Sequence, residues 1–184
     1  YIKSSEEWVP LPGALEAIAR LNHAGWHVVV ATNQSGIGRG LFDMVALNAM
    51  HAKMNQLLGR LGGRVDAVFF CPHTPEDACT CRKPLPGLFQ MIGQRFGCDL
   101  TGVPMVGDLP RDVLAAQSVG CEPHLVRTGQ ASTMSDADLT ALRAQVADLT
   151  IHPDLSAFAD FLILRDRRAD GDHAPVATHM GELT

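Results

Sequence analysis

The sequence predicts an α/β protein in which a parallel sheet carries helices on both faces, the doubly wound arrangement. Segments of strand character alternate with segments of helical character along most of the chain, and this alternation is typical of parallel sheets. Polar residues directly follow three of the predicted strands, at the sheet edge where such proteins bind their ligands. The 184 residues suffice for one domain with a sizeable core and are too few for two.

The first three elements are defined by turn residues and apolar spacing. A helix is predicted over residues 12–25, because Pro12-Gly13 opens it, Gly25 closes it, and apolar residues recur between them, namely Leu15, Ile18, Ala19 and Leu21. The β-branched run 28–30 predicts a buried strand that leads into a loop. A helix over 43–60 follows, with a stripe of core side chains at Met44, Leu47, Met50, Met54, Leu57 and Leu58.

Strands and helices continue to alternate in the second half of the chain. The predicted elements are a strand at 66–73, a helix at 86–97, a strand at 103–108, a helix at 111–120, a strand at 123–129 and a terminal helix that starts after Asp154. Residues 166–184 are charged and poor in large apolar side chains, so we expect a disordered tail there. The folded domain is thus expected to cover residues 1–165.

Composition excludes several classes of protein. No apolar run approaches the roughly 20 residues of a membrane helix, and the sequence shows neither a signal-type stretch nor a run of Lys or Arg. The formal net charge of -5 disfavours a nucleic-acid surface. We expect a cytoplasmic monomer that acts on a small molecule, with no nucleic-acid or membrane partner.

Three cysteines and one histidine are crowded into residues 71–81, at the end of the strand at 66–73 and in the loop after it. Cys71, His73, Cys79 and Cys81 follow the pattern C-x-H-x5-C-x-C, and thiolates with imidazole suit tetrahedral zinc. The protein would supply all four ligands, so the site would be closed and the zinc structural rather than catalytic. The odd total of five cysteines also fits a metal in a reduced compartment better than a disulfide framework.

Two cations, Arg82 and Lys83, directly follow the last of these ligands. A zinc-stapled loop would fix their direction above the strand ends, where they suit a phosphorylated substrate. Arginine offers a bidentate fork and lysine a point charge. The alternative is a solvated basic pair with no ligand.

The two other strand ends carry groups that suit phosphate chemistry. Asp108 ends one strand and Asp112 follows four residues later; such carboxylates suit Mg²⁺ together with phosphate and water, although an aspartate after a strand can also be a helix N-cap. After the strand at 28–30, hydroxyls, amides and glycines can approach an anion. The side chains concerned are Thr32, Asn33, Gln34 and Ser35.

Together, the segments VVVATNQSGIGRG, CPHTPEDACTCRKPLPG and MVGDLPRD resemble the haloacid dehalogenase (HAD) superfamily of phosphatases, in particular the D-glycero-D-manno-heptose 1,7-bisphosphate phosphatase family. The similarity extends from about Tyr1 to about Ser156, and the zinc loop joined to R-K-P is its most specific part. It implies a HAD-like, Rossmannoid domain with a small zinc-stapled loop and no large cap domain.

The resemblance implies a Mg²⁺-dependent phosphatase that removes the C7 phosphate from D-glycero-D-manno-heptose 1,7-bisphosphate, in the pathway of nucleotide-activated heptose for lipopolysaccharide core. By this resemblance Thr32 and Lys83 stabilise the phosphoryl group, Asp108 binds Mg²⁺ and Asp112 lies behind it. The implied substrate contacts are Thr32, Asn33, Gln34, Ser35, Arg39, Arg82 and Lys83. The wording TNQSGIGRG with Arg39 is closer to the heptose branch than to the histidinol-phosphate phosphatase branch, which shares the zinc loop.

One part of the family pattern is expected to be missing from this chain. The resemblance places the nucleophile, an aspartate of a D-x-D motif at the end of a first strand, upstream of Tyr1, so we expect this chain to lack a strand and to be inactive as given. Asp136 and Asp138 are interpreted as helix caps. The acids Asp166, Asp170 and Asp172 follow an apolar run and so imitate a strand with a D-x-D motif. Their use as that motif would imply a circular permutation. The spacing of Leu155, Phe158, Phe161 and Leu162 instead predicts a helix whose solvated end carries these acids.

Two functions from different classes are therefore open. The first is a sugar bisphosphate phosphatase, and the second is a catalytically inactive, zinc-stapled module that binds phosphate. We favour the enzyme, because Lys83 and Asp108 have little reason to accompany each other unless a phosphoryl group is transferred. A D-x-D strand encoded directly upstream of Tyr1 would distinguish the two.

Overall fold

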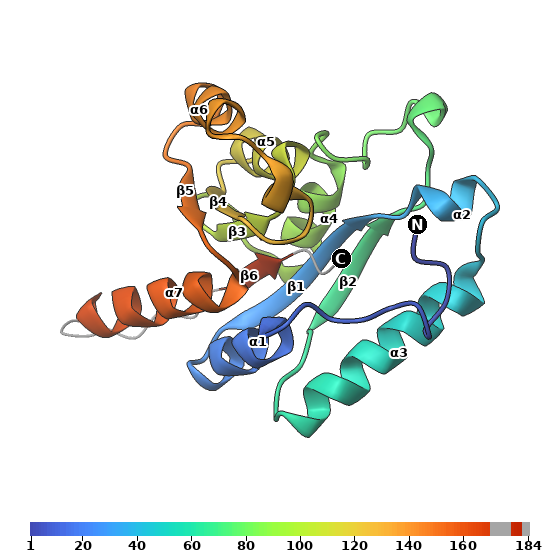
Figure 1. The fold of residues 1–184 in the computed structure, drawn as a ribbon, viewed down its shortest axis with the longest axis horizontal. Coiled ribbons are helices and arrows are strands. Elements are labelled where there is room, and N and C mark those ends of the chain that lie inside the picture. Colours follow the sequence, from blue (N-terminus) through green and yellow to red (C-terminus); the bar gives the residue numbers. More distant parts are fainter. Residues whose placement is uncertain (170–177, 182–184) are drawn as a thin grey trace.

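The fold is built around a parallel sheet, shown as a ribbon in Figure 1. The structure is a computed structural model that describes residues 1–169 and 178–181. Within these residues the strand order is β2-β1-β6-β3-β4-β5, and every pairing is parallel. The strands are β1 His27–Asn33, β2 Ala67–Cys71, β3 Pro104–Gly107, β4 Glu122–Val126, β5 Thr150–His152 and β6 Thr178–Gly181. The predicted α/β class with a parallel sheet is confirmed.

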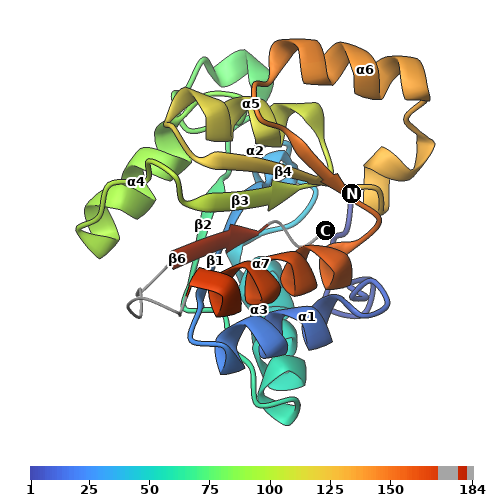
Figure 2. The ribbon, with the colours of Figure 1, turned by 90° about the vertical axis from the view of Figure 1, so that its left-hand side faces the viewer.

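Helices cover both faces of the sheet, as the doubly wound prediction requires (Figure 2). One face carries α1, α3 and α7, and α1 contacts both of the others. The other face carries α4 and α5, with α6 beyond α5. The helices are α1 Ala14–His23, α2 Ser35–Gly38, α3 Met44–Arg60, α4 Gly87–Phe96, α5 Pro110–Ser118, α6 Asp136–Gln145 and α7 Leu155–Ala169. None of the described helices is long and apolar enough to cross a membrane.

The core has two layers because successive strand residues point to opposite faces of the sheet. Val28 packs with Phe158 and Leu162 in the layer beneath α1, α3 and α7. Its neighbour Val29 packs with Phe89 and Ala115 in the layer beneath α4 and α5. The strands are therefore buried on both sides, which explains their continuous apolar runs in the sequence.

The segment before α1 is fixed to α3 and lies close to the carboxyl ends of the strands. Trp8 is buried in the core layer that includes α1 and α3. The ammonium group of Lys53 donates to the backbone oxygens of Ser5 and Trp8, both at 2.7 Å. These contacts hold residues 1–8 in place as one wall of the cleft described below.

Several elements differ from the sequence-based expectation. β1 continues to Asn33 because Thr32 and Asn33 pair with Phe70 and Cys71 of β2, so these two residues end a strand rather than begin a loop. Ser35 starts the short helix α2. Of α6 only the start was predicted, from Asp136 and Asp138 as helix caps, and the edge strand β5 was not predicted.

The expectation of a disordered tail over 166–184 is corrected at two places. Helix α7 continues to Ala169, and residues 178–181 form β6. β6 lies at the centre of the sheet, where Val29 pairs with Met180 on one side and Met105 pairs with Met180 on the other. Asp170 and Asp172 lie outside the described residues.

Candidate active site

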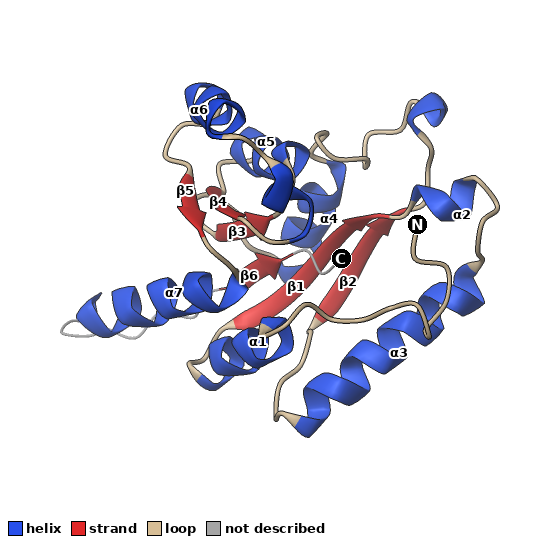
Figure 3. Ribbon diagram, in the orientation of Figure 1, coloured by secondary structure: helices blue, strands red, loops and turns tan. Residues whose placement is uncertain are grey.

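The polar side chains at the ends of β1, β2 and β3 meet at one edge of the sheet. Figure 3 shows the ends of β1 and β2 at this edge, close to α2. A cleft of about 430 Å³ opens there. We call it the strand-end cleft, and it is lined by Tyr1, Ile2, Trp8, Asn33, Gln34, Ser35, Met50, Arg82, Arg111 and Gln130. The predicted convergence of strand ends thus produces a cavity large enough for a sugar phosphate.

Lys83 and Asp112 form a buried ion pair beneath this cleft. The Nζ atom of Lys83 lies 3.0 Å from Oδ1 of Asp112, and the two side chains are 1% and 0% exposed. Lys83 also donates from Nζ to the backbone oxygen of Ala31 in β1, at 2.8 Å. The second oxygen of Asp112, Oδ2, accepts from the backbone N–H of Leu109 at 3.0 Å. Asp112 is thus held by its Oδ2, and its Oδ1 contacts the Lys83 ammonium group as an ion pair without hydrogen-bond geometry.

Asn33 and Thr32 are tied to their surroundings by their side chains. Asn33 accepts from the backbone N–H of Lys83 at 3.0 Å and donates to its backbone oxygen at 3.1 Å. This reciprocal pair fixes the loop that carries Lys83 to the end of β1. Thr32 is buried and its hydroxyl accepts from the Gln34 amide at 3.1 Å. Ser35 shares a hydrogen bond of 3.3 Å with the hydroxyl of Tyr1.

Asp108 follows β3 and is almost fully buried. Its Oδ2 atom accepts from the backbone N–H of Gln130 at 2.8 Å. Burial raises the pKa of Asp108, and the nearby negative charge of Asp112 raises it further. A Cβ atom on Gly129 would lie 2.2 Å from Oδ2 of Asp108, so only glycine leaves the carboxylate this position. A buried carboxylate beside a second one favours a bound cation, and its oxygens are of the type that Mg²⁺ prefers.

The two predicted arginines lie in different places. Arg82 lines the strand-end cleft, and its guanidinium donates to the backbone oxygen of His73 at 3.5 Å. Arg39 is not among the lining residues and lies 3.9 Å from the carboxylate of Glu76, with both side chains exposed. The Ser35 hydrogen bond, and then the charges of Arg39 and Arg82, lower the pKa of Tyr1. Arg39 is thus near the rim of the cleft rather than in its wall.

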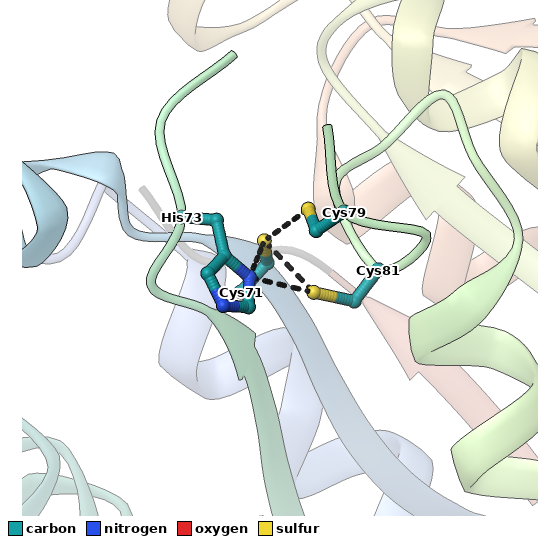
Figure 4. Close-up of side chains that lie close together, drawn as sticks. All are labelled: Cys71, His73, Cys79 and Cys81. Atoms are coloured by element: carbon teal, nitrogen blue, oxygen red, sulfur yellow. Dashed lines mark hydrogen bonds between the residues drawn. The ribbon is translucent and has the colours of Figure 1, made fainter. Parts of the chain in front are cut away.

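The four predicted metal ligands are brought together by the loop after β2 (Figure 4). Their ligand atoms all lie within 4.8 Å of one another. Sγ of Cys71 lies 3.6 Å from Sγ of Cys79 and 3.6 Å from Nδ1 of His73, while Sγ of Cys81 lies 3.0 Å from that of Cys71 and 3.2 Å from Nδ1 of His73. Zinc at about 2.3 Å from each sulfur would separate sulfurs by about 3.8 Å. The cluster therefore has nearly the size of a zinc tetrahedron.

Local structure explains how the loop folds around this cluster. Thr74 and Asp77 form a capping box in which the Asp77 carboxylate accepts from the Thr74 backbone N–H at 2.7 Å. The loop then turns back at Ala78 with a φ of 48°. A Cβ atom on Gly87 would lie 2.5 Å from the backbone oxygen of Thr80. Glycine at the start of α4 thus lets the second half of the loop pack directly on that helix.

Sequence reasoning missed part of the cleft. Tyr1, Ile2 and Trp8 come from the segment before the first helix, Met50 from α3, Gln130 from the turn after β4, and Arg111 from α5. The predicted core position of Met50 is also confirmed, because its side chain is buried. Only Arg111 carried a signal in the sequence, because it stands between Asp108 and Asp112.

Comparisons with known proteins agree with the geometry. Two family models match the chain, one described as HAD-hydrolase-like over residues 80–157 and one as polynucleotide kinase 3 phosphatase over residues 2–117. The D-glycero-β-D-manno-heptose-1,7-bisphosphate 7-phosphatase of Bordetella bronchiseptica is 58% identical over 129 residues, which cover 70% of this chain and 72% of the relative. The enzyme of that name from Pseudomonas aeruginosa is 52% identical over 71% of this chain and 73% of the relative.

The chain belongs to the heptose-1,7-bisphosphate 7-phosphatase family. A crystal structure of a member of this phosphatase family, the B. bronchiseptica enzyme complexed with magnesium and phosphate, covers 90% of this chain and 89% of its own, at 49% identity and a TM-score of 0.81. The resemblance drawn from the sequence segments is thereby confirmed, and so is the assignment to HAD-type phosphatases. That family member holds magnesium and phosphate, the two ligands expected for Asp108 and Lys83 in this chain.

Proposed function

We propose that this protein acts on D-glycero-D-manno-heptose 1,7-bisphosphate as a magnesium-dependent phosphatase specific for the C7 phosphate. The observation that carries the proposal is the buried Lys83–Asp112 ion pair beside Asp108, beneath a cleft with basic and polar walls. The ammonium group is fixed before any ligand arrives, so it can stabilise a phosphoryl group without reorganisation. The names of the relatives favour the heptose branch over the histidinol-phosphate branch.

Each side chain has a distinct part in this proposal. Lys83 and the Thr32 hydroxyl contact the transferred phosphoryl group, Asn33 positions Lys83 through its backbone, and Asp112 orients the ammonium group. Arg82 and Ser35 contact the substrate from the wall of the cleft. Arg39 would act from the rim. The covalent step implied by the family resemblance needs the aspartate of a D-x-D strand, and the residues described here supply the surroundings of that step.

Two metals are part of the proposal. Asp108 would hold Mg²⁺, and when bound the ion would neutralise negative charge on the phosphoryl oxygens. Cys71, His73, Cys79 and Cys81 would hold a structural zinc, because their ligand atoms form a closed set of four. The zinc would keep Arg82 and Lys83, directly after Cys81, aimed at the cleft.

The test uses this chain joined to an N-terminal D-x-D strand of the family. Phosphate release from heptose 1,7-bisphosphate in the presence of Mg²⁺ is monitored by ³¹P NMR. We expect the C7 resonance to be lost and the C1 resonance to remain. The matched control replaces the first aspartate of D-x-D by asparagine. Release of the C1 phosphate first, or equal release by the control, would contradict the proposal.

The same assay separates the roles of the two cations. Lys83→Ala should lower kcat by roughly 10²- to 10³-fold, because a cation aimed at the phosphoryl group acts mainly in the transition state. Arg82→Ala should mainly raise KM. A change in KM alone for both variants would show that these roles are assigned wrongly.

A further inference from the structure

Arg111 is a basic residue of the strand-end cleft. It lies in the first turn of α5, between Asp108 and Asp112, and its side chain lines the cleft. Its Nε atom is buried and has no hydrogen-bond partner among the described residues. A buried guanidinium N–H without an acceptor lowers the free energy of unfolding, so the presence of such a group in a native protein calls for an explanation.

Other arginines of the chain do have acceptors. Arg20 contacts Asp160, Arg64 contacts Asp66 and Arg165 contacts Glu122. Each of these three side chains is satisfied by a carboxylate of the protein itself. Arg111 has no such ion pair within the described part of the chain, although its backbone stands between two aspartates. Asp112 is directed to Lys83 and to the Leu109 backbone instead. A ligand bound in the cleft can supply the acceptor that the described residues do not provide for Nε of Arg111.

The cleft offers a second cation, Arg82, in addition to Arg111. Arg82 and Arg111 both line the cleft, and no aspartate or glutamate is among its lining residues. Arg82 directly precedes Lys83 and Arg111 directly precedes Asp112, and these two followers are joined by the buried ion pair of 3.0 Å. The ion pair thus ties together the two segments that carry these arginines, and both arginines line the same cleft. Two guanidinium groups with no carboxylate between them favour a dianionic group such as a phosphate monoester.

We propose that Arg111, together with Arg82, binds the phosphate that is not transferred, which makes Arg111 a specificity-determining residue. This rests on the proposed function, in which Lys83, Thr32 and Asp108 engage the C7 phosphate. A substrate with two phosphates then needs a second anion site elsewhere in the cleft, and the remaining basic groups of the cleft wall are Arg82 and Arg111. The apolar side chains of Trp8 and Met50 line the same cleft and can contact the carbon chain between the phosphates.

The experiment is a calorimetric titration of this chain without Mg²⁺, so that binding is measured and no turnover occurs. The ligands are heptose 1,7-bisphosphate and heptose 7-phosphate, which differ only in the C1 phosphate. Arg111→Gln keeps hydrogen-bonding groups and removes the charge. We expect it to lower the preference for the bisphosphate over the monophosphate by roughly 10- to 100-fold. Arg111→Lys should restore part of that preference.

Two controls separate this inference from the proposed function. Arg143→Gln changes an exposed arginine of α6 and should leave the preference as it is. The melting temperature of Arg111→Gln should not fall, whereas a structural arginine would lower it. If the unsubstituted chain binds neither ligand, the proposed function fails as well. If it binds both and Arg111→Gln weakens both equally, Arg111 contacts the transferred phosphate or none, and only this inference is overturned.

Discussion

Lys83 is tied to the fold through both its backbone and its side chain. Asn33 holds its peptide groups, and the ammonium group contacts Asp112 and the Ala31 backbone. The burial of both charges means that neither is screened by water. Each charge therefore depends on the other, and the removal of one leaves the other at a high free-energy cost.

Lys83→Met should consequently destabilise the protein as well as impair the reaction. We expect the free energy of unfolding to fall by about 3–5 kcal/mol, because Asp112 is left buried without its cation. Urea unfolding at pH 7 measures the loss. The double variant Lys83→Met/Asp112→Asn should recover much of it, since the asparagine oxygen can still accept from Leu109. If the double variant is less stable than the single one, the buried charge is not the cause.

His124 and His152 belong to a buried polar chain that also includes Glu122 and Arg165. Nδ1 of His124 lies 3.0 Å from Nε2 of His152, and Nε2 of His124 lies 2.9 Å from the Glu122 carboxylate. Arg165 contacts the same carboxylate at 2.7 Å. Burial lowers the pKa of His152 to about 4, and the electrostatic effect of the neighbouring His124 acts in the same direction.

This cluster should make stability depend on pH. The unfolded state takes up a proton on His152 below about pH 6.5, whereas the folded state does not until about pH 4. The contribution is therefore complete above pH 6.5 and is lost as the pH falls, by about 2–3 kcal/mol at pH 4.5. Urea unfolding from pH 7 to 4.5 should show this loss, with His152→Gln as the reference that cannot titrate. Parallel curves for the two proteins would contradict the assignment.

At the residue scale, the sequence predicted the side chains that stand next to a strand end and little else. Thr32, Lys83 and Asp108 could be found because each follows a recognisable strand or motif. The clamp of Asn33 on Lys83 could not, because it joins residues 50 positions apart. That Nε of Arg111 finds no acceptor among the described residues depends on where its neighbours direct their oxygens, and no pattern of residue types encodes that.

Among the elements, the loop that carries His73, Cys79 and Cys81 is the one whose sequence determines it most completely. The four candidate ligands are spaced so that a capping box and one left-handed residue, Ala78, suffice to bring them together. By contrast, β5 has only three residues, too few for a visible alternation. The start of α6 was predicted from the interpretation of Asp136 and Asp138 as caps. Asp138 does form a capping box with Ser135, whereas Asp136 is the first residue of the helix.

The metal prediction belongs to this loop. The purified protein should contain about one zinc per chain, and Cys79→Ser should lower both the zinc content and the melting temperature, the latter by roughly 5 °C. Elemental analysis under reducing conditions measures the first quantity and circular dichroism the second. Cys98→Ser, at a half-buried cysteine outside the cluster, is the control. Full zinc content in Cys79→Ser would contradict a four-ligand site.

On the scale of the whole molecule, the sheet consists of two groups of strands joined by β6. β2 and β1 form one group and β3, β4 and β5 the other, and β6 pairs with β1 and with β3. The sequence could not predict this, because a four-residue segment in a charged stretch carries no strand signal of its own. Its position is decided by partners that lie far away in the chain.

Deletion of residues 178–184 should therefore separate the two groups. We expect amide hydrogens of β1 and β3 to exchange faster, because these strands lose their hydrogen-bonded neighbour. Hydrogen exchange followed by mass spectrometry resolves the segments, and deletion of 182–184 alone is the control. Unchanged protection of Val28–Val30 and Met105 after the larger deletion would mean that β6 contributes nothing to the sheet.

The placement of β6 also has a consequence for the order in which the protein folds. Val29 pairs with Ala67 in β2 across a short stretch of chain, but with Met180 in β6 across one about four times as long. Closing the longer loop costs about 1.2 kcal/mol more in chain entropy, and contacts so far apart slow folding. The β1–β2 pair should thus form early and the central strand late. Until that last step, the facing edges of β1 and β3 are open to pairing with other chains, so refolding yield should fall as protein concentration rises.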